Sequence, residues 1–180
     1  MKTKMIAMAA LACAAALAAG TAGPTRPGLA AMEKGLDGQF AALWPDEPFL
    51  LLGATRGLCL DGYGAVFTTE LNLVAAPLRT PMSPPVPDAE SIERMHQKKL
   101  ERLAKLRTAM HAILAQTASS LDNIPPDQQI VLAVTLTRFS WENTTKIPTH
   151  IVMRGRRGDL LQAKNAGAAA LDQVVKVQEY

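Results

Sequence analysis

Hydrophobic and polar residues alternate most regularly over residues 53–73, where the chain reads GATRGLCLDGYGAVFTTELNL. Because successive side chains of a β-strand point to opposite faces, this alternation predicts a β-hairpin. If Gly62 and Tyr63 form a two-residue turn, Leu58 lies opposite Phe67 and most large apolar residues share one face. The other face then carries small and polar residues: Gly53, Thr55, Gly57, Thr68, Glu70 and Asn72.

Two amphipathic helices are predicted on either side of this hairpin. The first covers 29–44 and ends at Pro45. The second is long, is capped by Asp88 or Ser91, and runs to Leu121. Its apolar residues recur at spacings of three and four, which places them on one face: Leu103, Leu106, Met110, Ile113, Thr117 and Leu121.

The pattern of residues in the C-terminal third of the chain predicts further strands. Residues 130–139 alternate between a face of large apolar side chains and a face that carries Ala133, Thr135 and Thr137. A further strand begins at Thr149, a short helix follows near Asp159, and the chain ends in an edge strand. A proline-rich loop at 77–88 separates the hairpin from the long helix.

This order of elements indicates an α+β fold. We expect a two-layer sandwich in which the long helix packs across an antiparallel sheet of about five strands. The small-residue face of that sheet would be covered by the N-terminal helix, by a second subunit or by water.

The pattern of residues at the N-terminus predicts that the protein is exported. Two lysines precede an uninterrupted apolar run over residues 5–19, and small residues follow. This run is shorter than the roughly 20 residues that span a bilayer, which is typical of a secretory signal peptide. We expect a signal peptide at 1–22, a linker at 23–28 and one α+β domain at 29–180, in a periplasmic or secreted protein. The alternatives are an uncleaved anchor and lipidation at Cys13.

The net charge of the chain argues against one class of partner, nucleic acid, and says little about the others. Cleavage would remove Lys2 and Lys4, so the 19 basic residues fall to 17 against 16 acidic ones, a net charge of +1. This balance does not indicate nucleic-acid binding, and no membrane-spanning segment would remain. A basic stripe on the long helix is interleaved with acidic residues and is expected to be a solvated face: Arg94, Lys98, Arg102 and Lys105.

Cys59 is the one cysteine that remains after cleavage, so no internal disulfide can form. The predicted register places it on the small-residue face, opposite Val66. It could be buried, could bridge two molecules, or could be a reactive thiol that uses His150 or Asp61. The histidines show no metal-ligand spacing, and no metal or cofactor motif is present. The sequence therefore favours a protein that is not an enzyme.

A basic turn is the clearest candidate for ligand binding. Arg154, Arg156 and Arg157 are interleaved with Gly155 and Gly158 just before the short C-terminal helix. Guanidinium groups and a helix start suit a carboxylate or a phosphate, although a solvated turn has the same composition. Thr55 and Glu70 form a polar patch on the small-residue face, where they could contact a ligand or only water.

The segment LCLDGYGAVFTTELNL, with IVLAVTL and GDLL further on, resembles a group of uncharacterised bacterial proteins. These proteins carry a signal peptide and a GYG-VF hairpin followed by a long helix, and the resemblance implies no activity. The order of elements is also similar to that of roadblock and profilin-like sandwiches, many of which are protein-interaction scaffolds.

The sequence as a whole predicts an exported, non-enzymatic module that binds another protein or itself. The first alternative is a small-anion binder that uses the basic turn at 154–157. The second is an envelope enzyme that depends on Cys59.

Overall fold

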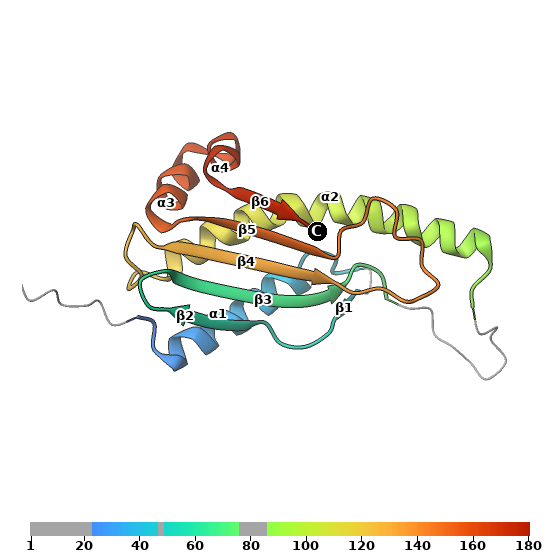
Figure 1. The fold of residues 1–180 in the computed structure, drawn as a ribbon, viewed down its shortest axis with the longest axis horizontal. Coiled ribbons are helices and arrows are strands. Elements are labelled where there is room, and N and C mark those ends of the chain that lie inside the picture. Colours follow the sequence, from blue (N-terminus) through green and yellow to red (C-terminus); the bar gives the residue numbers. More distant parts are fainter. Residues whose placement is uncertain (1–22, 47–48, 76–85) are drawn as a thin grey trace, which may run out of the picture.

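The computed structural model describes residues 23–46, 49–75 and 86–180. The predicted signal peptide at 1–22 and most of the proline-rich loop lie outside the described residues. The fold is α+β as predicted, with one sheet and a layer of helices (Figure 1). The elements in chain order are α1 (Arg26–Ala41), β1 (Leu50–Leu51), β2 (Arg56–Leu60), β3 (Gly64–Asn72), α2 (Ala89–Ser120), β4 (Gln129–Leu136), β5 (His150–Arg156), α3 (Arg157–Ala166), α4 (Ala168–Val174) and β6 (Lys176–Glu179).

The sheet is mixed, so the prediction of a purely antiparallel sheet is wrong. Its described strands follow the order β1, β3, β4, β5 and β6, and β2 pairs with the same edge of β3 as β1 does. Strands β3 and β4 are parallel, whereas the other pairs are antiparallel. Strands β3 and β4 run parallel because the long helix α2 connects them. A helical crossover of this kind returns the chain to the end of the sheet where the previous strand began.

The hairpin register differs by one residue from the predicted one. Leu58 pairs with Val66, and Leu60 pairs with Gly64, so the turn contains the three residues 61–63. Gly62 adopts φ 72°, the left-handed conformation that such a turn requires. Because a one-residue shift moves every side chain of a strand to the other face, Leu58 and Leu60 point away from the helices and are 45% and 47% exposed.

The core lies between the sheet and α2. The predicted stripe of α2 is buried, and so are the large apolar residues of β4, as expected. On β3 the inward residues are those the alternation predicted, with Ala65, Phe67 and Leu71 fully buried. Gly57 and Cys59 of β2 also point inward. The ring of Phe67 lies over Gly57, where a Cβ atom would come within 2.7 Å of Phe67 Cε1.

Helix α1 packs on the same side of the sheet as α2. It begins at Arg26, within the predicted linker, and Thr25 Oγ1 caps it by accepting a hydrogen bond from the Gly28 N–H. Leu36 and Phe40 of α1 are fully buried in the core that α2 shares. Figure 1 shows α1 and α2 passing behind the strands. The N-terminal helix therefore does not cover the opposite face, which was one of the three possibilities for the small-residue face.

Two carboxylates of α1 bind the edge of the hairpin. Glu33 Oε1 accepts a hydrogen bond of 2.8 Å from the Gly57 N–H, and Asp37 Oδ1 accepts one of 2.8 Å from the Thr55 N–H. The spacings match, because four residues of helix rise about 6 Å and two residues of strand extend about 6.6 Å. The Gly57 N–H, assisted by Arg26, holds the pKa of Glu33 below its ordinary value.

The observed register predicts that Gly57 tolerates no side chain. Gly57→Ala should lower the free energy of unfolding by about 1–3 kcal/mol, because the new methyl group would displace the Phe67 ring. Gly35→Ala is the matched control, since Gly35 lies in α1 with nothing within 4 Å. That change should raise stability by roughly 0.5–1 kcal/mol. Urea unfolding measures both, and a Gly57→Ala protein as stable as the original would contradict the register.

Candidate functional site

The surface that faces away from α1 and α2 is here called the outer face. The paired strands place its side chains in two rows across the sheet, Leu58–Val66–Val131–Arg154–Lys176 and Arg56–Thr68–Ala133–Val152–Gln178. A third row continues from Glu70 through Thr135 to His150. No described helix lies in front of these strands in the view of Figure 1. Within the described ranges, the outer face is therefore uncovered.

The centre of the outer face is apolar. Val131 is only 6% exposed, and Val66, Ala133 and Val152 around it are half-buried. These residues sit on or beside the parallel pair β3–β4. Sheets made of parallel strands are usually covered on both faces, so an uncovered parallel pair with an apolar outer surface is unusual. The predicted small-residue character is confirmed for Ala133 and Thr135, which do lie here.

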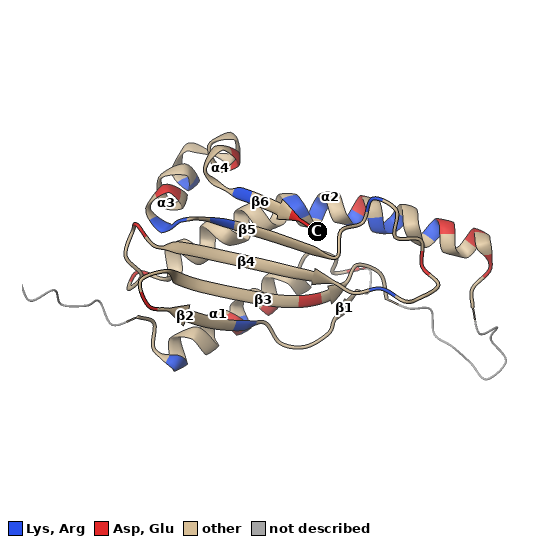
Figure 2. Cartoon of the chain, viewed as in Figure 1, with Lys and Arg blue, Asp and Glu red and all other residues tan. Residues whose placement is uncertain are grey.

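Basic side chains border this centre. Arg56 lies on the β2 side, and Arg154, Arg156 and Lys176 lie on the side of β5 and β6. Two acidic residues stand on the same strands: Glu70 of β3 faces outward, whereas Glu179 of β6 bonds to Arg107 of α2 on the inner side. Figure 2 shows basic positions on β2, β5 and β6 and an acidic position on β3. Arg154 makes no hydrogen bond or ion pair with any described residue, and its Nε is buried. The outer face is thus electropositive around an apolar centre.

The predicted arginine cluster is divided between two sides of the sheet. Arg154 and Arg156 belong to the outer face. Arg157 points inward instead, and its Nε donates a hydrogen bond of 3.1 Å to the carbonyl of Ala118, near the C-terminal end of α2. A cation at that position satisfies a terminal carbonyl and complements the helix dipole. Arg157 therefore has a structural contact, and the three arginines do not form one site.

Thr55 and Glu70 do not come together either. Thr55 is fully buried, and its hydroxyl bonds to Asp37 at 2.6 Å and to the Thr69 hydroxyl. Glu70 is exposed on the outer face. The prediction that both residues share one polar patch is wrong, because the turn of the chain between β1 and β2 places Thr55 beneath α1.

The position of Cys59 is also corrected. It lies on the inner side, paired with Ala65 and packed against the core, rather than on the small-residue face opposite Val66. Burial raises the pKa of the Cys59 thiol, and the nearby Asp61 carboxylate raises it further. Both effects lower the fraction of reactive thiolate near neutral pH.

None of the histidines is placed to activate Cys59. His150 lies on the outer face, where its Nδ1 is 3.1 Å from the Thr135 hydroxyl. His96 Nδ1 lies 3.1 Å from the carbonyl of Asn143, and His111 Nδ1 lies 3.0 Å from Asp172 Oδ1. In the part of the chain that the structure describes, no group of histidine, cysteine and acidic residues could hold a metal ion. A membrane span is also missing from the described helices, none of which is both long and apolar enough.

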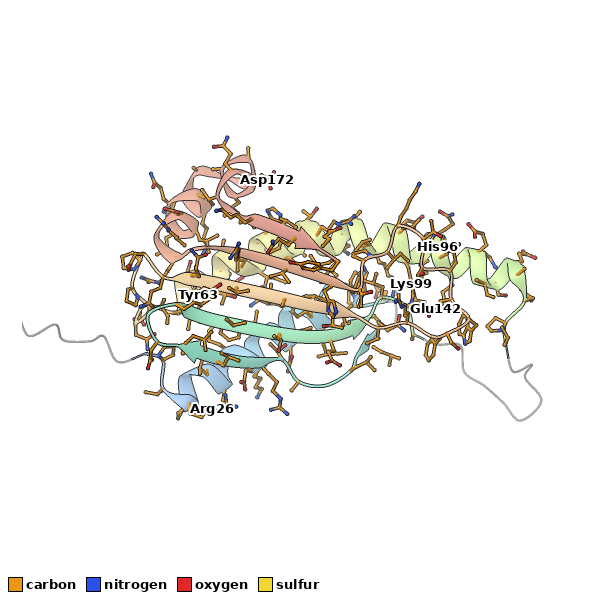
Figure 3. All side chains as sticks on the ribbon, viewed as in Figure 1. Arg26, Tyr63, His96, Lys99, Glu142 and Asp172 are labelled. Carbon is orange, nitrogen blue, oxygen red and sulfur yellow. The ribbon has the colours of Figure 1, made fainter. Side chains whose placement is uncertain are left out.

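The sequence analysis missed a buried polar cluster on the N-terminal half of α2. His96, Lys99 and Arg102 follow one another at spacings of three and are almost completely buried. Lys99 Nζ donates to Glu142 Oε2 at 2.5 Å, and Figure 3 shows the two side chains meeting between α2 and the loop after β4. Arg102 Nη1 donates to the carbonyl of Leu73 at 2.5 Å, and its guanidinium lies over the Trp44 ring.

This cluster joins α2 to two neighbouring segments and is structural. Arg102 was expected on a solvated basic stripe, but it is buried. The spacing of three residues between His96, Lys99 and Arg102 places them on one side of the helix, and this spacing was the signal in the sequence that could have revealed the cluster. Burial lowers the pKa of Lys99, and the bond to Glu142 offsets part of that shift. The other oxygen of Glu142 is buried without a hydrogen-bond partner among the described residues.

A groove also lies along α2. It has a volume of about 630 Å³, and Trp44 forms part of its wall. Charges of both signs line it: Glu90, Glu93, Arg94, Lys98, Glu101, Arg102 and Lys105. Because these charges alternate along the helix, the groove has no field of one sign, and it is a weaker candidate than the outer face.

The buried pair predicts a strongly non-additive response to mutation. Lys99→Met should lower the free energy of unfolding by about 3–5 kcal/mol, because it leaves the Glu142 carboxylate buried without its cation. The double variant Lys99→Met/Glu142→Leu should recover most of that loss, since two apolar side chains need no pairing. Urea unfolding of both single variants and the double variant measures the coupling. Additive losses would show that the two residues do not form a buried pair.

Comparison with known proteins identifies no relative: no protein-family model matches the chain, no curated protein matches it, and no solved structure matches it. The function must therefore be argued from the surface described above.

Proposed function

We propose that this protein is an exported, non-enzymatic module that binds a protein partner through the outer face of its sheet. The observation that carries the proposal is the uncovered parallel pair β3–β4, whose outer surface is apolar at Val66, Val131 and Ala133. Burying such a surface contributes about 25 cal/mol for each Å² of apolar area removed from water. The signal peptide predicted at 1–22 supports export.

The face, rather than the β2 edge of the sheet, is the surface available for binding. An exposed edge strand can accept another strand through its free N–H and C=O groups. On β2 the Gly57 N–H is already bonded to Glu33, and the Thr55 N–H just before it is bonded to Asp37. Helix α1 thereby blocks that edge and leaves the outer face untouched.

The alternatives receive less support from the geometry. A small-anion site would keep Arg154 and Arg156 but would lose Arg157, which bonds to α2. An enzyme that uses Cys59 would need a base on the inner side of β2, and His150 lies on the outer face. Partner binding uses the apolar centre and the basic border together, so it accounts for more of the surface.

Photocrosslinking in the producing cell tests this function. With p-benzoylphenylalanine in place of Thr135, in the third row of the outer face beside the apolar centre, illumination should yield an adduct of defined higher mass. The same group in place of Gln116, exposed on α2, should not yield that adduct. The Thr135 position reports on a partner because any bound protein lies within reach of it. No adduct from Thr135, or the same adducts from both positions, would contradict the proposal.

A further inference from the structure

We infer that the partner presents an amphipathic, acidic helix that lies along β3 and β4 on the outer face. This inference rests on the proposed function and adds the chemistry and shape of the bound element. The observations behind it are the sign of the charges, the distance between them and the short side chains of the apolar centre.

The charges on the outer face call for an acidic partner. Four basic residues face outward from the described strands against one outward-facing acid, Glu70: Arg56, Arg154, Arg156 and Lys176. Arg154, Arg156 and Lys176 have no ion pair or hydrogen bond from their side chains to a described residue. Complementary charge raises the association rate and rejects partners of the wrong sign. Carboxylates on the partner would also match the fork geometry of the arginines.

The spacing of these charges fits a helix. Arg56 lies on β2 and Arg154 lies on β5, so three inter-strand spacings, or about 14 Å, separate their strands. A helix with its side chains is about 10–12 Å wide. Acidic side chains on its two flanks would therefore reach Arg56 on one side and Arg154 on the other. One extended strand, about 5 Å from its neighbours, is too narrow to reach both.

The apolar centre admits a helix. Ala133 and the nearby Val66, Val131 and Val152 are short, and Val131 is only 6% exposed, so a helix can approach the strands closely. Leu58 and Leu60 at the β2 border do project and are 45% and 47% exposed. Binding to a lipid surface also depends on apolar groups that enter the acyl region, so an anionic membrane is the competing occupant, and binding to vesicles distinguishes it from a helix.

A second copy of this chain is a poor occupant of the outer face. Two copies packed face to face would bring two surfaces of four basic residues and one acidic residue together. Like charges that face each other across an interface cost on the order of several kcal/mol of binding free energy, and this cost suppresses the pairing. The structure therefore favours a different protein over self-association through this face.

Selection from a random-peptide display library tests the inference. The library is selected on the purified protein and counter-selected on Val152→Glu, which places a carboxylate on the outer face. Retained peptides should carry apolar residues at helical spacing, flanked by Asp and Glu. Arg154→Glu should weaken their binding at least tenfold in fluorescence anisotropy. Lys34→Glu is the matched control, because it reverses one exposed charge on α1, on the other side of the sheet, and should leave binding unchanged. Circular dichroism checks that all variants fold.

The outcomes separate the two proposals. Peptides that depend on Val152 but are neutral or basic would overturn this inference and leave the proposed function standing. No peptide that distinguishes the protein from Val152→Glu would overturn both. Binding to phosphatidylglycerol vesicles that Arg154→Glu abolishes, without any selected peptide, would overturn both in favour of an anionic membrane.

Discussion

The two hydrogen bonds from the hairpin to Glu33 and Asp37 decide the architecture of this protein. They fix α1 beside α2, so both helices lie on one side of the sheet. The Phe67 ring explains why β2 carries Gly57 on its inner side, since a Cβ atom there would come within 2.7 Å of that ring, whereas Glu33 of α1 lies at an ordinary contact distance. The same contacts close the β2 edge, and the opposite face of the sheet is left uncovered within the described ranges.

Much of the fold follows from local periodicity. The stripe of α2, the inward residues of β3 and β4 and the C-terminal edge strand were predicted correctly because each depends on the alternation within one segment. The register of β2 was predicted wrongly because either register pairs small and apolar residues. The choice between the two registers depends on the packing of Phe67 over Gly57 and on the contacts of β2 with α1. These are tertiary contacts, so the alternation of residues within one strand does not predict them. The parallel pairing of β3 and β4 likewise depends on the path of the chain through α2.

The candidate site was predictable only in part. Ala133, Thr135 and Glu70 lie on the outer face, as their strands indicated, and Arg154 and Arg156 join them. Arg157 was assigned to a ligand-binding turn and Thr55 to the small-residue face, but both side chains bond within the interior. The Lys99–Glu142 pair was missed because its members are 43 residues apart, and burial of charge is decided by tertiary packing. The outer face is formed by several strands, and each strand contributes only a few residues to it. No single segment of the sequence therefore reveals this surface.

Cysteine accessibility on the two faces of β4 tests most directly whether the outer face is uncovered. In a Cys59→Ser background, Thr135→Cys should react with N-ethylmaleimide in the folded protein without local opening, slowed only by its partial burial among neighbouring side chains. Val134→Cys, on the inner face, should react on the order of 100-fold more slowly, because the thiol is reached only when the core opens locally. Equal protection at both positions would show that another part of the molecule covers the outer face, and would contradict the proposed architecture.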